Sequence, residues 1–290
     1  MKLPVDFRLL KERYFGAASR RPWVAEKRLE ELAPYLQPET AEIAQRAVAS
    51  LMAYQDPDYA LLYLSRLARY AGPDKTPPAF LSDIALRLDR RMRYIDPPGA
   101  AQAALVESGE SGAESVRHVF CLCDLVGLLP PRVADRICKV LSRLGWSDRP
   151  IGLHFAARGG LRRRWTRMWT LLRYVRKYSQ RAKIENAWVE RWLHMIDRVH
   201  RIQPSAVIHV VRSADFIVGE GPAYHRSVAN WHVIVDRLIK PTCDGSLTVD
   251  LAAVLPEVLS VAEERPEAAV LAQRIDSLVR SSPAQQLQMA

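Results

Sequence analysis

Apolar residues recur at every third or fourth position along most of the chain, and this spacing constrains the fold more than any other feature. In the stretch that follows Pro38, for example, Ile43, Ala47 and Leu51 fall on one stripe, as residues do on the buried face of a helix. Glycine is scarce at 13 residues, and β-branched residues rarely alternate with polar ones. The pattern predicts an all-α protein, an irregular bundle of about 12–14 helices without a significant sheet.

The chain has 290 residues, which is enough for one large helical domain. We predict a single domain over residues 1–290, with a weak subdivision at the polar, glycine-containing stretch 107–113. Within this plan, residues 114–127 are expected to form a helix and residues 146–160 a loop.

Two features of the sequence bear on location. No uncharged apolar run approaches the roughly 20 residues that a membrane-spanning helix needs. The first residues, Met1 to Asp6, include charges at once, whereas a secretory signal begins with an apolar core close behind its basic end. We therefore expect a cytoplasmic protein that does not contact a membrane.

The thiols and imidazoles form no recognisable metal motif. The four cysteines, Cys121, Cys123, Cys138 and Cys243, include no CxxC pair, and two cysteines in a C-x-C arrangement cannot readily bridge each other. His225 and His232 are seven residues apart on one expected helix, but no cysteine or carboxylate is placed to complete a zinc site with them. We expect reduced, mostly buried thiols and no metal.

Residues 158–183 form a strongly basic segment, with ten Lys or Arg residues and no Asp or Glu. Because the whole chain has a net charge of +10, the rest is close to neutral. A buried stripe is expected at Leu161, Trp165, Met168, Leu172 and Val175. The residues predicted to bind a partner or an anion are Arg158, Arg162, Arg163, Arg167, Arg173, Arg176, Lys177 and Arg181.

Three interpretations of this segment stay open at the level of sequence. It could be a solvated face partly paired with the chain's own acids, for example Glu185 or Glu190. It could be a docking face for an acidic protein or an anionic cofactor. It could also bind nucleic acid, with charge for phosphates and tryptophan rings for stacking, although no known nucleic-acid-binding module accompanies it.

Other combinations of residues give only incomplete sites. Asp56, Tyr59 and Tyr63 could line a pocket between helices and support a small-molecule enzyme, although capping of the next helix also explains Asp56. Gly219-Glu220-Gly221 lacks the third glycine and the preceding strand of a dinucleotide-binding turn. No complete catalytic set is found, which predicts a chain that is not catalytic by itself.

Three separated stretches carry a resemblance to a known family. They are Leu51-Met-Ala-Tyr-Gln-Asp-Pro-Asp-Tyr-Ala-Leu-Leu-Tyr-Leu-Ser-Arg-Leu67, Leu128-Leu-Pro-Pro-Arg-Val-Ala-Asp-Arg-Ile137, and Ser213-Ala-Asp-Phe-Ile-Val-Gly-Glu-Gly221 continued by Arg226-Ser-Val-Ala-Asn230. In order and rough spacing they resemble the helical C-terminal region of the large beta subunits of indolepyruvate:ferredoxin oxidoreductases. The resemblance covers most of residues 40–240 and departs at Val218-Gly219-Glu220-Gly221, where a Lys-Gly-Tyr-Gly-like turn is expected.

In that family, the thiamine diphosphate and iron–sulfur sites lie on other domains. The resemblance therefore implies that this chain binds neither cofactor and that its partners are other oxidoreductase subunits. We predict a non-catalytic helical subunit or domain that assembles with, or regulates, an indolepyruvate-type 2-oxoacid oxidoreductase and docks through its basic helix. The alternative is a nucleic-acid-binding protein that uses residues 158–183.

Overall fold

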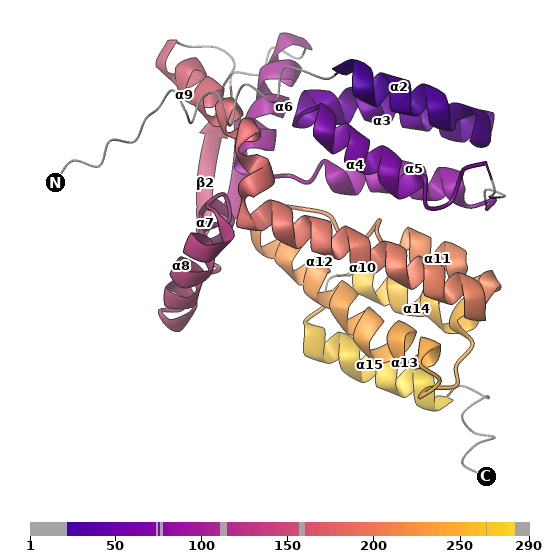
Figure 1. Ribbon diagram of the computed structural model, residues 1–290. Coiled ribbons are helices and arrows are strands. Elements are labelled where there is room, and N and C mark those ends of the chain that lie inside the picture. The colour runs from indigo at the N-terminus through magenta and orange to yellow at the C-terminus, as the bar shows by residue number, and fades with distance from the viewer. Residues whose placement is uncertain are drawn as a thin grey trace. The chain divides into compact units, whose positions relative to one another are not determined.

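The computed structural model describes residues 22–73, 75, 78–110, 115–156, 160–264 and 266–281. These residues are mostly helical with one two-stranded sheet, so the chain is all-α, as predicted (Figure 1). They group into two compact units. The first comprises residues up to 118 with 122–147 and 151–185, and the second comprises 119–121, 148–150 and the residues from 186 onward. The main boundary, between Glu185 and Asn186, lies within one long helix, and residues 111–113 of the predicted weak subdivision lie outside the described residues.

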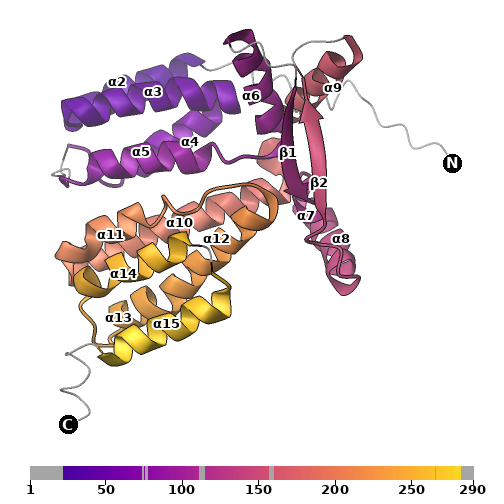
Figure 2. The same cartoon turned by 180° about the vertical axis from the view of Figure 1, so that it is seen from behind.

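The first unit begins with helices α2 (Pro22–Leu32), α3 (Pro38–Tyr54), α4 (Pro57–Leu67) and α5 (Leu81–Met92), and a 3₁₀ turn, η1 (Ala33–Tyr35), follows α2. Helices α2 and α3 lie side by side over α4 and α5 (Figure 2). Each of α2, α3 and α4 starts with proline, whose fixed φ suits the first helical position. The apolar stripe predicted for α3 is buried, with Leu51 at 0% exposure.

The remaining elements of the first unit include those that carry the basic segment, from α9 to the start of α10. Helix α6 (Pro97–Glu110) packs against α9 (Gly160–Leu171), and the small side chains of Ala100, Ala101 and Ala104 on α6 are buried. Two 3₁₀ turns, η2 (Leu172–Tyr174) and η3 (Arg176–Tyr178), lead from α9 into α10 (Gln180–Ile202). Helices α7 (Leu122–Val126) and α8 (Pro131–Arg143) complete the set.

The sheet corrects two expectations. Residues within the predicted helix 114–127 form strand β1 (Val116–Cys121), and residues within the predicted loop 146–160 form strand β2 (Pro150–Phe155). In β2, Ile151, Leu153 and Phe155 are less exposed than the residues between them, which is the alternation of a half-buried strand. Both strands are six residues long, and in such short runs helical and extended spacing are hard to tell apart.

The second unit is built around indole rings. Trp188 and Trp192 on α10 stack with ring centroids 6.0 Å apart, and the predicted i,i+4 pair thus lies in the core, with Trp192 at 0% exposure. Trp192 Nε1 donates to Val210 O at 3.1 Å. Buried Trp231 Nε1 donates to Ser213 Oγ, also at 3.1 Å. These bonds satisfy the indole N–H groups of Trp192 and Trp231 in an apolar surrounding.

The other helices of the second unit are α11 (Val207–Arg212), α12 (Gly221–Ile234), α13 (Lys240–Cys243), α14 (Leu251–Glu263) and α15 (Ala268–Ser281), with a 3₁₀ turn η4 (Pro204–Ala206) and a π-helical turn η5 (Val235–Ile239). Helices α12, α14 and α15 pack against one another, with Leu255 and Ile275 fully buried. Within the described ranges, no helix combines the length and the apolar character needed to span a membrane.

Candidate functional site

The basic segment divides into a buried part and an exposed part. Arg176 belongs to the buried part, because its residue exposure is 1%. Its Nε and Nη2 donate to the two carboxylate oxygens of Asp96, each at 2.8 Å. Its Nη1 donates to Tyr54 O, and its guanidinium lies 3.8 Å from the centre of the Tyr54 ring. Burial, the largest single cause, lowers the pKa of Arg176, but Asp96, Tyr54 and Tyr94 together raise it above its ordinary value. Arg176 therefore stabilises the first unit instead of meeting a partner.

A second buried group joins three elements of the first unit. Arg181 Nη1 donates to Asp124 Oδ1 at 3.2 Å, and its Nε lies 3.0 Å from Glu185 Oε1. Arg91 donates to the other oxygen of Glu185 at 2.8 Å. All four side chains are at most 8% exposed. The expectation that Glu185 pairs with the basic segment is thus confirmed for Arg181, which is not part of an exposed face.

Lys177 and Arg173 are also engaged within the first unit. Lys177 Nζ lies 3.3 Å from Asp56 Oδ2. Burial, the largest single cause, lowers the pKa of the Lys177 amine, but Asp56, with Tyr178 and Asp58, raises it above its ordinary value. Arg173 Nη1 donates to Ala53 O at 3.2 Å. Arg158 lies outside the described residues. Of the predicted binding residues that the structure describes, the exposed ones are Arg162, Arg163 and Arg167.

These three arginines belong to an exposed surface that we call the α9 face. Its side chains combine charge with large apolar groups, and none makes an ion pair with a described residue. The α9 face comprises Leu161, Arg162, Arg163, Arg164, Trp165, Arg167, Met168 and Leu171. Leu161 is 82% exposed and Leu171 is 59% exposed. On a helix of 3.6 residues per turn, the apolar members form one band. Arg164 lies within this band and Arg162 and Arg167 lie beside it, whereas Arg163 lies further round the helix.

The expected buried stripe of α9 is wrong in its orientation. Leu161, Trp165, Met168 and Leu172 are exposed, and Val175 is half-buried. The side of α9 that faces inward carries Thr166, at 0% exposure. Ala156 N donates to Thr166 Oγ1 at 2.9 Å, and this hydroxyl donates to Arg162 O at 3.1 Å. A small residue with a satisfied hydroxyl lets α9 approach its neighbours closely, which the large apolar residues would prevent.

A cleft with a volume of 790 Å³ lies within the first unit, where α3, α6 and η2 approach one another. Its walls include Tyr54, Tyr94, Arg93, Arg173 and His118. The volume is in the range of ligand pockets, but Arg93 already binds Asp89 and Arg173 binds the α3 backbone.

The predicted pocket residues Asp56, Tyr59 and Tyr63 do not line this cleft. Asp56 caps α4 by accepting from Tyr59 N at 2.9 Å. Tyr59 Oη donates to Met92 O, and Tyr63 Oη donates to Ala85 O. Burial raises the pKa of both phenols well above the ordinary value of a tyrosine. The structure therefore gives these three residues structural roles.

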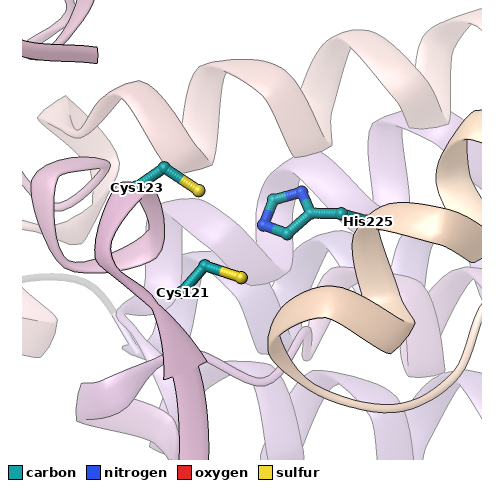
Figure 3. A group of neighbouring side chains, drawn as sticks. All are labelled: Cys121, Cys123 and His225. Carbon is teal, nitrogen blue, oxygen red and sulfur yellow. The ribbon is translucent and has the colours of Figure 1, made fainter. Parts of the chain in front are cut away.

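A group of thiols and an imidazole was missed in the sequence. The Sγ atom of Cys121 and a ring nitrogen of His225, both in the second unit, lie within 4.8 Å of each other, and Cys123 follows Cys121 by two residues (Figure 3). Cys121 is buried, and the other two side chains are half-buried. The C-x-C pair was visible, but no spacing rule links it to a histidine so far along the chain.

The fold and these sites define an all-helical protein whose prominent exposed feature is a helix face both cationic and apolar. The chain belongs to a family of unknown function (DUF6537), whose model matches residues 40–237. This range contains the three stretches that carry the resemblance described above. No curated protein and no solved structure matches the chain.

Proposed function

We propose that this chain is a non-catalytic helical subunit or domain that docks, through the α9 face, onto an acidic subunit of an indolepyruvate-type 2-oxoacid oxidoreductase in the cytoplasm. The observation that carries the proposal is the exposure of Leu161, Trp165, Met168 and Leu171 among arginines that have no ion pair with a described residue. Thiamine diphosphate and iron–sulfur clusters would then be held by the partner.

The composition of the α9 face favours a protein partner over nucleic acid. Arginine, tryptophan and methionine are enriched in protein interfaces, and a contiguous exposed apolar patch marks a binding surface. Nucleic acid would use the charge and the Trp165 ring but would leave Leu161, Met168 and Leu171 exposed to water. A partner with carboxylates around an apolar strip would satisfy both kinds of side chain.

The choice of an oxidoreductase partner rests on the resemblance alone. The family match extends over residues 40–237, close to the part of the chain that resembles the oxidoreductase subunits. The buried ion pairs of Arg176 and Arg181 support the proposal indirectly, because they fix the positions of η3 and the start of α10, which follow α9 in the chain.

The experiment is affinity purification of tagged full-length chain from its native host, with the bound proteins identified. We expect an acidic subunit of a thiamine-dependent oxidoreductase to copurify. Substitution of Arg162, Arg163 and Arg167 by Glu should lower its recovery more than about tenfold, because like charges then face the partner. Trp165→Ala should lower the affinity by about 30-fold, as for a central interface residue.

The matched control replaces Arg132, Arg136 and Arg143 of α8 by Glu, since these are also exposed arginines on a helix of the first unit. It has the same change of charge and should leave recovery of the partner unchanged. Recovery of nucleic acid with a steep loss of affinity in salt, or loss of the partner equally in both triple variants, would contradict the proposal.

A further inference from the structure

We propose that the cleft of the first unit binds a small monocarboxylate with an aliphatic body, and that Arg173 holds the carboxylate. The cleft has a volume of 790 Å³, and Figure 1 shows α6, which forms one of its walls, between α3 and α9. All the described residues that line the cleft belong to the first unit. None of them belongs to the α9 face, so the proposal does not depend on the function proposed for that face.

The buried ion pair of Arg176 holds one wall of the cleft in place. Tyr54 lines the cleft, its ring lies 3.8 Å from the Arg176 guanidinium, and its Oη donates to Tyr94 O at 2.7 Å. Gly99 lines the cleft beside it, where a Cβ would lie 2.9 Å from Asp96 Oδ1 and 3.5 Å from the Tyr54 ring. The cleft is therefore formed before any ligand binds, which lowers the entropic cost of binding.

Arg173 brings an unbalanced positive charge to the cleft. Its Nη1 donates to Ala53 O at 3.2 Å and its Nη2 to Tyr174 Oη. Both acceptors are neutral, no described Asp or Glu pairs with Arg173, and its Nε is still available to a ligand. Arg93 differs, because its Nε and Nη2 donate to the two carboxylate oxygens of Asp89. Its charge is balanced, although its Nη1 donates to no described residue.

The remaining polar groups of the lining favour an anion. The hydroxyls of Ser50 and Thr170 donate to backbone carbonyls of their own helices, so the guanidinium groups supply the N–H donors for a ligand. None of the described lining residues is Asp or Glu, so nothing there would balance a bound cation. One unbalanced guanidinium matches the single charge of a carboxylate, whereas a phosphate monoester carries about −1.5 to −2.

The rest of the lining is mostly aliphatic and matches an alkyl chain. Ile95 is 47% exposed and Val106 is 68% exposed, so a chain laid against them would remove apolar surface from water. Each methylene group that is fully buried raises the affinity by roughly a factor of four. The aliphatic lining residues are Ala53, Ile95, Ala100, Ala103, Leu105 and Val106.

The test is equilibrium dialysis of the purified full-length chain with octanoate as the probe. One octanoate should bind per chain with a dissociation constant below about 1 mM. Butanoate should bind at least about tenfold more weakly, because its chain buries fewer methylene groups. Octanol, which has the same chain without the charge, should also bind at least about tenfold more weakly. Octylamine, with the opposite charge, should not bind.

Two variants place the bound octanoate in the cleft. Arg173→Met should lower the affinity at least about tenfold, as the loss of a hydrogen bond to a charged group does. Ala103→Phe fills the cleft from an exposed position and should lower the affinity at least as much. The matched controls are Arg132→Met on α8 and Ala253→Phe on α14, which change exposed residues outside the lining and should leave the affinity unchanged.

If Arg173→Met loses its helical circular dichroism, Ala103→Phe and the comparison of octanoate with octanol still decide the outcome. The proposal would be overturned by equal affinities for octanoate and octanol, or by tighter binding of octyl phosphate than of octanoate. It would also be overturned by an unchanged octanoate affinity in Ala103→Phe, or by no octanoate binding up to about 10 mM.

Discussion

The ion pair between Arg176 and Asp96 gives the largest stability effect expected from the structure. Asp96→Asn removes the charge of the partner while keeping an oxygen that can accept from Gly99 N, as Asp96 Oδ1 does at 2.7 Å. The Arg176 side chain is 0% exposed and that of Asp96 is 2% exposed, so the variant leaves an uncompensated charge in the core. Breaking such a pair costs about 3–5 kcal/mol, a large fraction of a typical free energy of unfolding.

Urea unfolding followed by circular dichroism measures this cost. Arg28→Met is the matched control within the same unit, because Arg28 and Glu31 pair at 3.0 Å with both side chains 48% exposed, and it should cost at most about 1 kcal/mol. Adding Arg176→Met to Asp96→Asn should recover much of the loss, since no buried charge then lacks its partner. A loss below about 0.5 kcal/mol for Asp96→Asn alone, within the range of ordinary surface substitutions, would refute this reasoning.

Three further predictions concern single positions. Thr166→Val removes the acceptor of Ala156 N and should lower the free energy of unfolding by about 1–3 kcal/mol. Thr166→Ser keeps a hydroxyl acceptor and should retain most of the stability of the original protein. Urea denaturation measures both variants. Gly221→Ala should cost at least about 1–3 kcal/mol in the same assay, because a Cβ at φ +51° meets Val119 O, and a neutral result would be contrary to the close approach. Burial and the Arg191 charge lower the pKa of His232, so below about pH 6.5 the unfolded state binds more protons than the native state. The free energy of unfolding should therefore decrease as the pH is lowered from about 7 to about 5. His232→Gln should make this decrease smaller.

The helical fold could be predicted because its signal is local. The stripe of Ile43, Ala47 and Leu51 and the prolines at helix starts each determine their own segment, and α3 and α4 follow them. The two strands could not be predicted in the same way, because β1 and β2 are brought together by pairing across a long connection. The alternation of Ile151, Leu153 and Phe155 was the available signal for β2.

The candidate sites depended on information that the sequence does not hold. Composition showed that residues 158–183 are basic, but it did not distinguish Arg176, which faces Asp96, from Arg163, which faces solvent. The orientation of α9 was predicted wrongly because a helical wheel assumes that the most apolar side is buried. In this protein the buried side of α9 carries Thr166. The cluster of Cys121 and His225 requires the contact between β1 and α12, which only the tertiary structure reveals.

The most direct test of the docking role is photo-crosslinking in the native host from a benzophenone amino acid placed at position 168 on the α9 face. The same probe at position 140 on α8, where Val140 is 53% exposed, serves as the control. The proposal predicts a covalent adduct between position 168 and an acidic subunit of a thiamine-dependent oxidoreductase, with none from position 140. Adducts from position 168 to nucleic acid alone, or no adduct above the control, would contradict it.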